Sequence, residues 1–170
     1  MNRFARIMQT IGILGSIALI FVWIQGLEVG DIATNVARHT TLALGAASGC
    51  LLSHLWAIAF LGFSARGRRQ LLLADNLRMP DASGQREVAR WRRLAVTAAA
   101  FAILLLGASF ALGGAALLRR VAPAVHAGIG AAAVLAQLVA LAVERRALRL
   151  DQSQVAALDL PLPVSLQPQS

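Results

Sequence analysis

The sequence contains no lysine, no tyrosine and a single cysteine in 170 residues. One cysteine, Cys50, excludes an intrachain disulfide. Arginine supplies every basic side chain, a bias typical of high-GC bacterial genomes. Aspartate, glutamate and arginine are absent from the four long apolar stretches. This absence argues against an enzyme such as a hydrolase and against a proton-coupled transporter that uses a carboxylate within the membrane.

The four apolar stretches account for most of a chain that is 58% hydrophobic. They cover residues 7–26, 40–63, 94–118 and 122–143, each long enough at about 20 residues to cross a hydrocarbon core as a helix. The sequence therefore predicts an all-α integral membrane four-helix bundle with a single transmembrane domain, residues 1–150. We expect residues 65–93 to form a cytoplasmic helical hairpin that turns at Pro80. Residues 151–170, which contain three prolines, are expected to form a disordered cytoplasmic tail.

The arginines are distributed unevenly between the two ends of the predicted spans. Thirteen precede the first span, lie between the second and third, or follow the fourth, and only Arg38, Arg119 and Arg120 lie on the other side. The positive-inside rule then puts both termini in the cytoplasm of a bacterial inner-membrane protein. The net charge of +8 serves orientation and contact with anionic lipid, so the expected partners are the bilayer and a membrane protein or second copy, with no nucleic acid. A nucleic-acid or acidic-protein dock on the central segment is the alternative.

Small residues spaced four apart occur in every predicted span. Such pairs allow helix backbones to approach closely, which favours association in lipid. The pattern predicts helix-packing seams that either hold one bundle together or face a second subunit. The seam residues are Gly12 and Ser16, Gly45 and Gly49, Ser109 and Gly113, and Gly128 and Ala132.

Three histidines and one glutamine fall at matching depths in the second and fourth spans. These two spans run in the same direction, so His39 and His126 begin them at the same membrane surface. His54 lies about 22 Å deeper than His39, and Gln137, eleven residues beyond His126, reaches nearly the same depth. At about 100° per residue, each span carries both of its polar residues on one side. We therefore expect an outer pair of His39 with His126 and a structural polar pair of His54 with Gln137.

Two imidazoles on facing helices are the ligand set of a low-spin haem, and small residues beside them admit the macrocycle. His39 and His126, with His54 as a third, are accordingly candidate ligands for haem b. In the plainer alternative, His39 is interfacial, His126 reaches water and His54 is structural. A copper site is a further alternative, although no metal-binding spacing links its possible ligands: His39, His126, Cys50 and Met8.

Residues 53–68, SHLWAIAFLGFSARGR, resemble the end of the second span in a family of uncharacterised bacterial four-span membrane proteins. In that family a histidine and an aromatic stretch precede Ile-Gly-Thr-Gly and a basic residue, as His54 precedes Gly62 and Arg66 here. The family is also similar in carrying histidines at the start of the second and fourth spans, which match His39 and His126. The resemblance implies the four-span topology and no established activity.

Three functions are consistent with these features. The first is a non-enzymatic membrane subunit or scaffold that packs through its small-residue seams in a larger complex. The second is a b-type haem or quinone-associated electron-transfer subunit, which requires a cavity beside His39 and His126. The third is a small transporter or channel component, which requires a hydrated path lined by Ser53, His54, Ser109 and Gln137.

Overall fold

The computed structural model describes residues 3–28, 33–74, 82–118 and 120–156. These residues form four helices: α1 (Arg3–Glu28), α2 (Ala33–Ala74), α3 (Ala82–Leu117) and α4 (Pro123–Ala156). Each helix is long and apolar enough to cross a membrane. The predicted all-α class with four membrane-length helices is thereby confirmed.

The helices extend well beyond the predicted spans. α2 continues to Ala74 and α3 begins at Ala82, so most of residues 65–93 is helical, and the turn at Pro80 lies outside the described residues. α4 continues past the predicted end of its span at Val143 to Ala156, because no glycine or proline interrupts this part of the chain. Of the tail predicted to be disordered, residues 151–156 are helical and residues 157–170 lie outside the described part.

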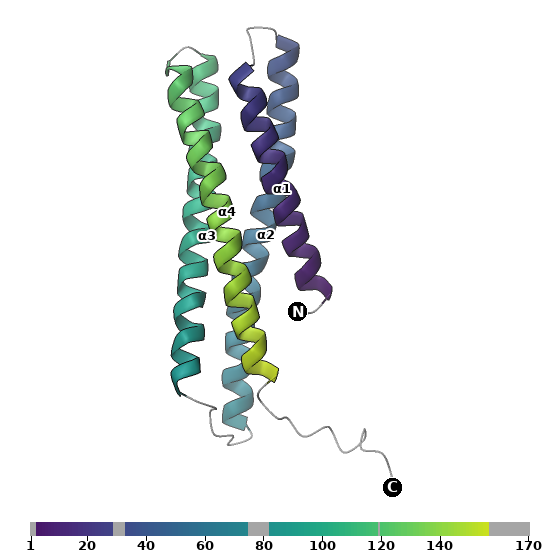
Figure 1. Ribbon diagram of the computed structural model, residues 1–170, viewed down its shortest axis with the longest axis vertical. Coiled ribbons are helices and arrows are strands. Elements are labelled where there is room, and N and C mark those ends of the chain that lie inside the picture. The colour runs from purple at the N-terminus through teal and green to yellow at the C-terminus, as the bar shows by residue number, and fades with distance from the viewer. Residues whose placement is uncertain (1–2, 29–32, 75–81, 119, 157–170) are drawn as a thin grey trace.

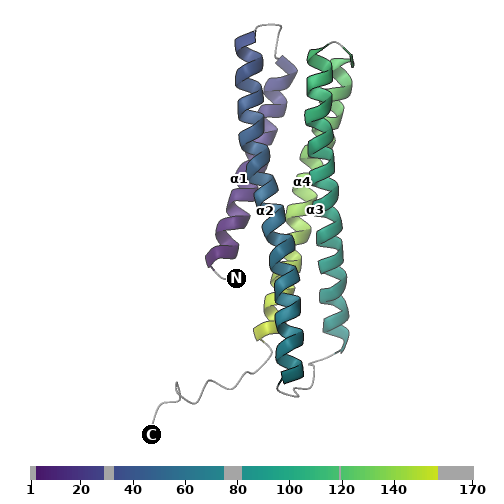
Figure 2. The same ribbon diagram turned by 180° about the vertical axis from the view of Figure 1, so that it is seen from behind.

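The four helices are arranged as two antiparallel hairpins, α1 with α2 and α3 with α4 (Figures 1 and 2). α2 and α4 consequently run in the same direction. We call the end at which α2 and α4 begin the loop end, and the opposite end the terminal end. Contacts are most extensive within each hairpin. Between the hairpins, α4 packs on α1 and α2, and α2 packs on α3, whereas the described residues of α1 and α3 do not meet.

Close packing in the first hairpin depends on small residues. A Cβ atom added at Gly15 would lie 3.0 Å from the backbone nitrogen of Cys50 and 3.1 Å from the carbonyl oxygen of Ala46. The Ser16 hydroxyl donates to the Gly12 carbonyl at 2.9 Å and lies 3.7 Å from the Cys50 sulfur. The backbones of α1 and α2 therefore approach as closely as small-residue interfaces between membrane helices allow.

The small residues predicted to form seams differ in what surrounds them. Ser109 and Ala132 are half-buried. At Gly45 and Gly128, an added Cβ would meet no atom within 4 Å, so these glycines face away from the other described helices. Five of the predicted seam residues do contact another helix: Gly12, Ser16, Gly49, Ser109 and Gly113.

Large apolar side chains cover the outside of the bundle. The most exposed include Leu104 at 71%, Phe63 at 67%, Phe21 at 66% and Leu135 at 64%. Apolar surface on this scale is unfavourable in water and suits contact with hydrocarbon. The outer surface therefore agrees with the membrane-length helices in indicating a multi-pass membrane protein.

We expect Gly15→Ala to destabilise the bundle and Gly45→Ala to leave its stability nearly unchanged. The added methyl group at residue 15 meets backbone atoms of α2, which cannot rotate away, and overpacking of this kind costs about 1–3 kcal/mol. The methyl group at residue 45 meets open space. Unfolding of the purified protein by increasing mole fractions of SDS, followed by circular dichroism, measures both. Equal effects of the two substitutions would contradict the packing described for α1 and α2.

Candidate functional site

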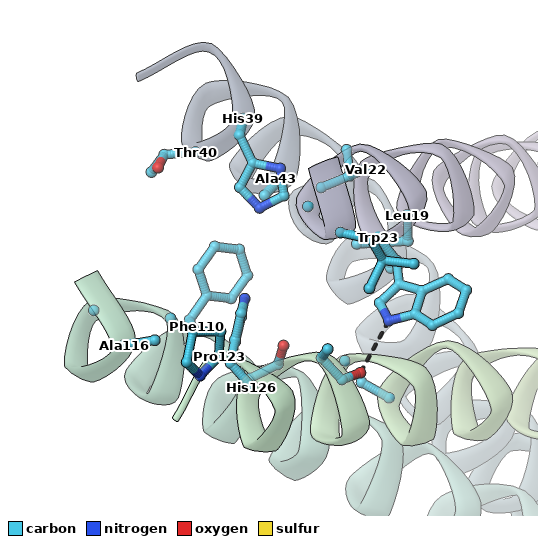
Figure 3. Close-up of a pocket in the computed structure, with 18 of the residues that line it drawn as sticks. Leu19, Val22, Trp23, His39, Thr40, Ala43, Phe110, Ala116, Pro123 and His126 are labelled. Atoms are coloured by element: carbon cyan, nitrogen blue, oxygen red, sulfur yellow. Dashed lines mark hydrogen bonds between the residues drawn. The ribbon is translucent and has the colours of Figure 1, made fainter. Parts of the chain in front are cut away.

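A pocket of about 460 Å³ lies between the two hairpins near the loop end. Figure 3 shows its walls, which come from all four helices. Most of the lining is apolar, including Leu19 of α1, Phe110 of α3 and Val134 of α4. The polar side chains that reach it are few, and two of them are the imidazoles of His39 and His126.

The two imidazoles enter the pocket from different hairpins, His39 from α2 and His126 from α4 (Figure 3). Each ring lies against a glycine of the neighbouring helix in its own hairpin. A Cβ atom added at Gly26 of α1 would lie 2.8 Å from Cε1 of His39, and one added at Gly113 of α3 would lie 3.0 Å from Cε1 of His126. The absence of a side chain at these glycines therefore gives each imidazole its position.

The Nδ1 atoms of His39 and His126 are buried and have no hydrogen-bond partner among the described residues. An unpaired buried N–H group costs about 1–3 kcal/mol, so the proton of each neutral ring is better placed on Nε2. In that tautomer each histidine offers an Nε2–H group as its remaining donor. The pocket is consequently an apolar space supplied with two hydrogen-bond donors.

Trp23 of α1 closes one side of the pocket and connects the two hairpins. Its indole Nε1–H donates a hydrogen bond of 2.9 Å to the carbonyl oxygen of Ala127 on α4, the dashed line in Figure 3. A Cβ atom added at Gly130 would lie 3.0 Å from Cδ1 of the indole. The Trp23 indole therefore packs on Gly130 of α4, as the two imidazoles pack on glycines of their own hairpins. Both α1 and α4 contribute residues to the lining of the pocket.

A second polar cluster lies deeper in the bundle, at His54. The ring is fully buried, and both of its nitrogens have partners on α4. Nδ1 lies 2.7 Å from Oε1 of Glu144, and Nε2 contacts Oε1 of Gln137. The Gln137 amide nitrogen donates to the carbonyl oxygen of Ala102 on α3 at 3.4 Å. This cluster joins three helices and leaves His54 no free nitrogen for a haem or metal.

The two predicted histidine levels have different surroundings. His39 and His126 line one pocket, and His54 and Gln137 are in contact, so the structure brings both pairs together. His54 does not reach the pocket. Cys50 also lies outside it, beside Ser16, and so apart from the histidines of the considered copper site.

The structure buries an acidic side chain, that of Glu144, which the predicted bounds of the fourth span leave outside it. With the fourth span ended at residue 143, Glu144 fell just outside it, but α4 continues and the Glu144 side chain is buried against His54. Asp151 is buried as well and accepts a hydrogen bond from Ser64 of α2. The signal for both was the seven-residue spacing from Gln137 to Glu144 to Asp151, which keeps the three side chains on one side of a helix.

We expect Gly113→Ala to move the His126 ring, because the new methyl group would press on its Cε1 atom. Gly114→Ala is the matched control, since Gly114 also lines the pocket but an added Cβ there meets nothing within 4 Å. Histidine side-chain ¹H–¹⁵N spectra of the labelled protein in micelles provide the measurement. The His126 resonances should shift in the first variant and stay in place in the second. Unshifted His126 resonances in Gly113→Ala would show that this glycine does not position the ring.

Comparison of the chain with protein-family models, with curated proteins and with solved structures finds no match. The chemistry of the site is therefore argued from the pocket and from the residues that line it.

Proposed function

We propose that this chain is a multi-pass protein of the bacterial inner membrane that binds the ring of a membrane quinone in the histidine pocket. The observation that carries the proposal is the pocket itself, an apolar space with one imidazole from each hairpin. Its volume of about 460 Å³ falls within the range of about 300–1,000 Å³ typical of small-molecule sites. Binding of this kind associates the protein with membrane electron transfer, as a cofactor-binding subunit.

The hydrogen-bonding capacity of the pocket favours a quinone over a haem. A quinone ring carries two carbonyl oxygens, which accept hydrogen bonds, and His39 and His126 each offer an Nε2–H donor. Iron ligation through Nε2 would move the proton to Nδ1. Metal-ligating histidines almost always donate that second N–H to an acceptor, and neither Nδ1 has a partner among the described residues.

The position of the pocket in the bundle also fits a lipid-soluble ligand. It lies between helices near the loop end, and its apolar lining matches a ring that arrives from the bilayer. Trp23, whose indole is amphipathic, lies at this same level, as side chains of the membrane interface do. A quinone head group resides at this depth, while its isoprenoid tail extends between the lipid chains.

The arginines support an orientation with both chain ends in the cytoplasm. Among the described residues, twelve arginines lie toward the terminal end, on α1 and on the extensions of α2, α3 and α4, against Arg38 and Arg120 at the loop end. Positive charge is retained on the cytoplasmic side during insertion. The histidine pocket then lies near the periplasmic surface.

A packing subunit or scaffold in a larger complex is the second candidate function. The observation that favours it is the open surface at Gly45 and Gly128, where an added Cβ meets nothing in this chain. Glycines on a lipid-facing surface allow the backbone of another helix to approach closely. This role is compatible with quinone binding, because the open glycines lie outside the pocket lining.

We expect His39→Ala and His126→Ala each to weaken quinone binding about 5- to 10-fold, the loss of one hydrogen bond of about 1 kcal/mol or slightly more. Quenching of tryptophan fluorescence by a short-chain ubiquinone or menaquinone analogue measures the affinity, because Trp23 lines the pocket. Leu135→Ala, on the outer surface of α4, is the control and should bind like the wild type.

Any of three results would overturn the quinone proposal. Unchanged affinity in both histidine variants would show that the imidazoles do not contact the ring. A reduced b-type absorption spectrum that disappears in His39→Ala or His126→Ala would instead assign the pocket to haem. A purified protein that binds neither quinone nor haem would leave the packing subunit as the function.

We expect a green fluorescent protein fused after Ser170 to fluoresce and an alkaline phosphatase fused there to be inactive. Green fluorescent protein exported through the bacterial secretion pathway does not mature, whereas alkaline phosphatase requires the periplasm to form its disulfides. Fusions placed after Arg38 in truncated chains should behave in the opposite way. An active phosphatase at the C-terminus would reverse the proposed orientation.

A further inference from the structure

His54 and Glu144 form an ionisable pair within the apolar length of the bundle. His54 is 0% exposed and Glu144 is 2% exposed. A single buried charge in such surroundings costs several kcal/mol, so buried ionisable groups are found neutral or paired. The protonation of this pair therefore has to be considered as one unit.

The Gln137 amide fixes the tautomer of His54. Its nitrogen donates to the Ala102 carbonyl, which can only accept, so its oxygen is the atom that faces His54. An amide oxygen also only accepts, and the Nε2 atom of His54 must therefore carry a hydrogen. Every exchange of a proton by this ring is thus confined to Nδ1, which faces Glu144.

One proton between Nδ1 and Glu144 leaves the pair without net charge, either as imidazole with carboxylic acid or as imidazolium with carboxylate. Loss of that proton would leave a carboxylate facing the lone pair of Nδ1. Addition of a second would set two donors against each other and leave a net positive charge. Both changes put an uncompensated charge into the bundle, and both disrupt the 2.7 Å contact between α2 and α4.

We propose that His54 and Glu144 form a buried site that binds one exchangeable proton, and that this proton keeps α2 against α4. The site is distinct from the histidine pocket and does not depend on the nature of the pocket's ligand. The cluster of Leu19, Ala46, Ala47, Cys50 and Leu106 lies between the two.

Few other ionisable groups lie near the site. Residues 7–27 of α1 contain none, and on α3 the nearest are Arg92, which is half-buried, and Arg93, which is exposed. On α2 the nearest ionisable group is Cys50, one turn before His54. On α4 the nearest are Arg145 and Arg146, whose side chains are exposed. Asp151, further along α4, accepts a hydrogen bond from Ser64. Among the described residues, the carboxyl group of Glu144 is the one acidic group in contact with His54.

The contact matters because the hairpins meet through limited surfaces. Most contacts are within each hairpin, whereas α2 makes far fewer contacts with α4 and α3. The His54 cluster supplies contacts to both of these helices. Whether the pair holds its proton thus determines whether α2 remains packed against α3 and α4.

The pH dependence of unfolding tests the proposal, with Glu144→Gln as the matched variant. A glutamine amide can donate to Nδ1 and preserve the contact, but it cannot release a proton. Well above pH 6.5, the ordinary pKa of histidine, an unfolded chain holds no ionisable proton on either group, whereas the folded pair holds one. Stability must then fall as pH rises, because the folded state binds more protons. The quantity compared is the unfolding equilibrium constant of the full-length wild type divided by that of Glu144→Gln. This ratio should rise about tenfold per pH unit. The rise should end at the pH at which the folded pair releases its proton.

The experiment is SDS-induced unfolding in mixed micelles between about pH 6.5 and pH 9. Asp151→Asn is the control, since it also changes a buried carboxylate of α4 to an amide, and it should follow the wild-type slope. The histidine pocket and Cys50 are the same in all three proteins, so their contribution to the pH dependence cancels in the comparison. Equal slopes for the wild type and Glu144→Gln would overturn the proposal.

A second measurement applies if Glu144→Gln does not fold. Side-chain ¹⁵N spectra of the histidine-labelled wild type, with His54 assigned by its absence from His54→Asn, report the proton on each ring nitrogen. At pH 8 the Nε2 atom should carry a hydrogen, and the Nδ1 signal should be that of a nitrogen hydrogen-bonded to a shared or transferred proton. A His54 ring protonated on Nδ1 alone, or a bare Nδ1 without a hydrogen bond, would contradict the site.

Discussion

The interface between the two hairpins is maintained by polar contacts between α4 and the helices of the first hairpin. In lipid, burying an apolar side chain against another gains little, so helix association depends on close packing and on hydrogen bonds. The first hairpin has close packing, as Gly15 against Cys50 shows. Between the hairpins, hydrogen bonds recur at three levels: Trp23 with Ala127, His54 with Glu144 and Gln137, and Ser64 with Asp151. The arrangement of both candidate sites follows from these contacts.

Small residues serve two purposes in this bundle, and only one of them is helix packing. Gly15 allows two backbones to approach, as expected for a membrane interface. Gly26, Gly113 and Gly130 instead accommodate the rings of His39, His126 and Trp23, so they shape the pocket between the hairpins. A small-xxx-small pattern does not distinguish these uses, because both require only that a side chain be missing.

The sequence was sufficient to predict the helices and the matching polar levels, because hydropathy and helical rise determine both. His39 with His126 and His54 with Gln137 follow from residue spacing on two parallel helices. Hydropathy alone ends the fourth span at residue 143, so it does not predict the burial of Glu144. The buried face of α4 nevertheless continues past residue 143, with buried side chains spaced alternately by four and three residues. These side chains are Ala140, Glu144, Ala147 and Asp151. The Ala102 carbonyl could not be predicted as a hydrogen-bond partner of Gln137, because every residue has a backbone carbonyl and the residue type does not show which one is used.

The two ionisable sites are separated along the bundle, and this separation limits what each can do. The pocket at His39 and His126 lies near the loop end, and the apolar cluster around Leu19 and Leu106 lies between it and His54. A second apolar cluster, which includes Leu61, Ala95 and Leu148, follows toward the terminal end. Proton transfer requires a continuous chain of donors and acceptors, and side chains of this kind supply none. On the two proposals above, a ligand in the pocket would exchange protons through the loop end, and the proton at His54 and Glu144 would exchange when the hairpins move apart.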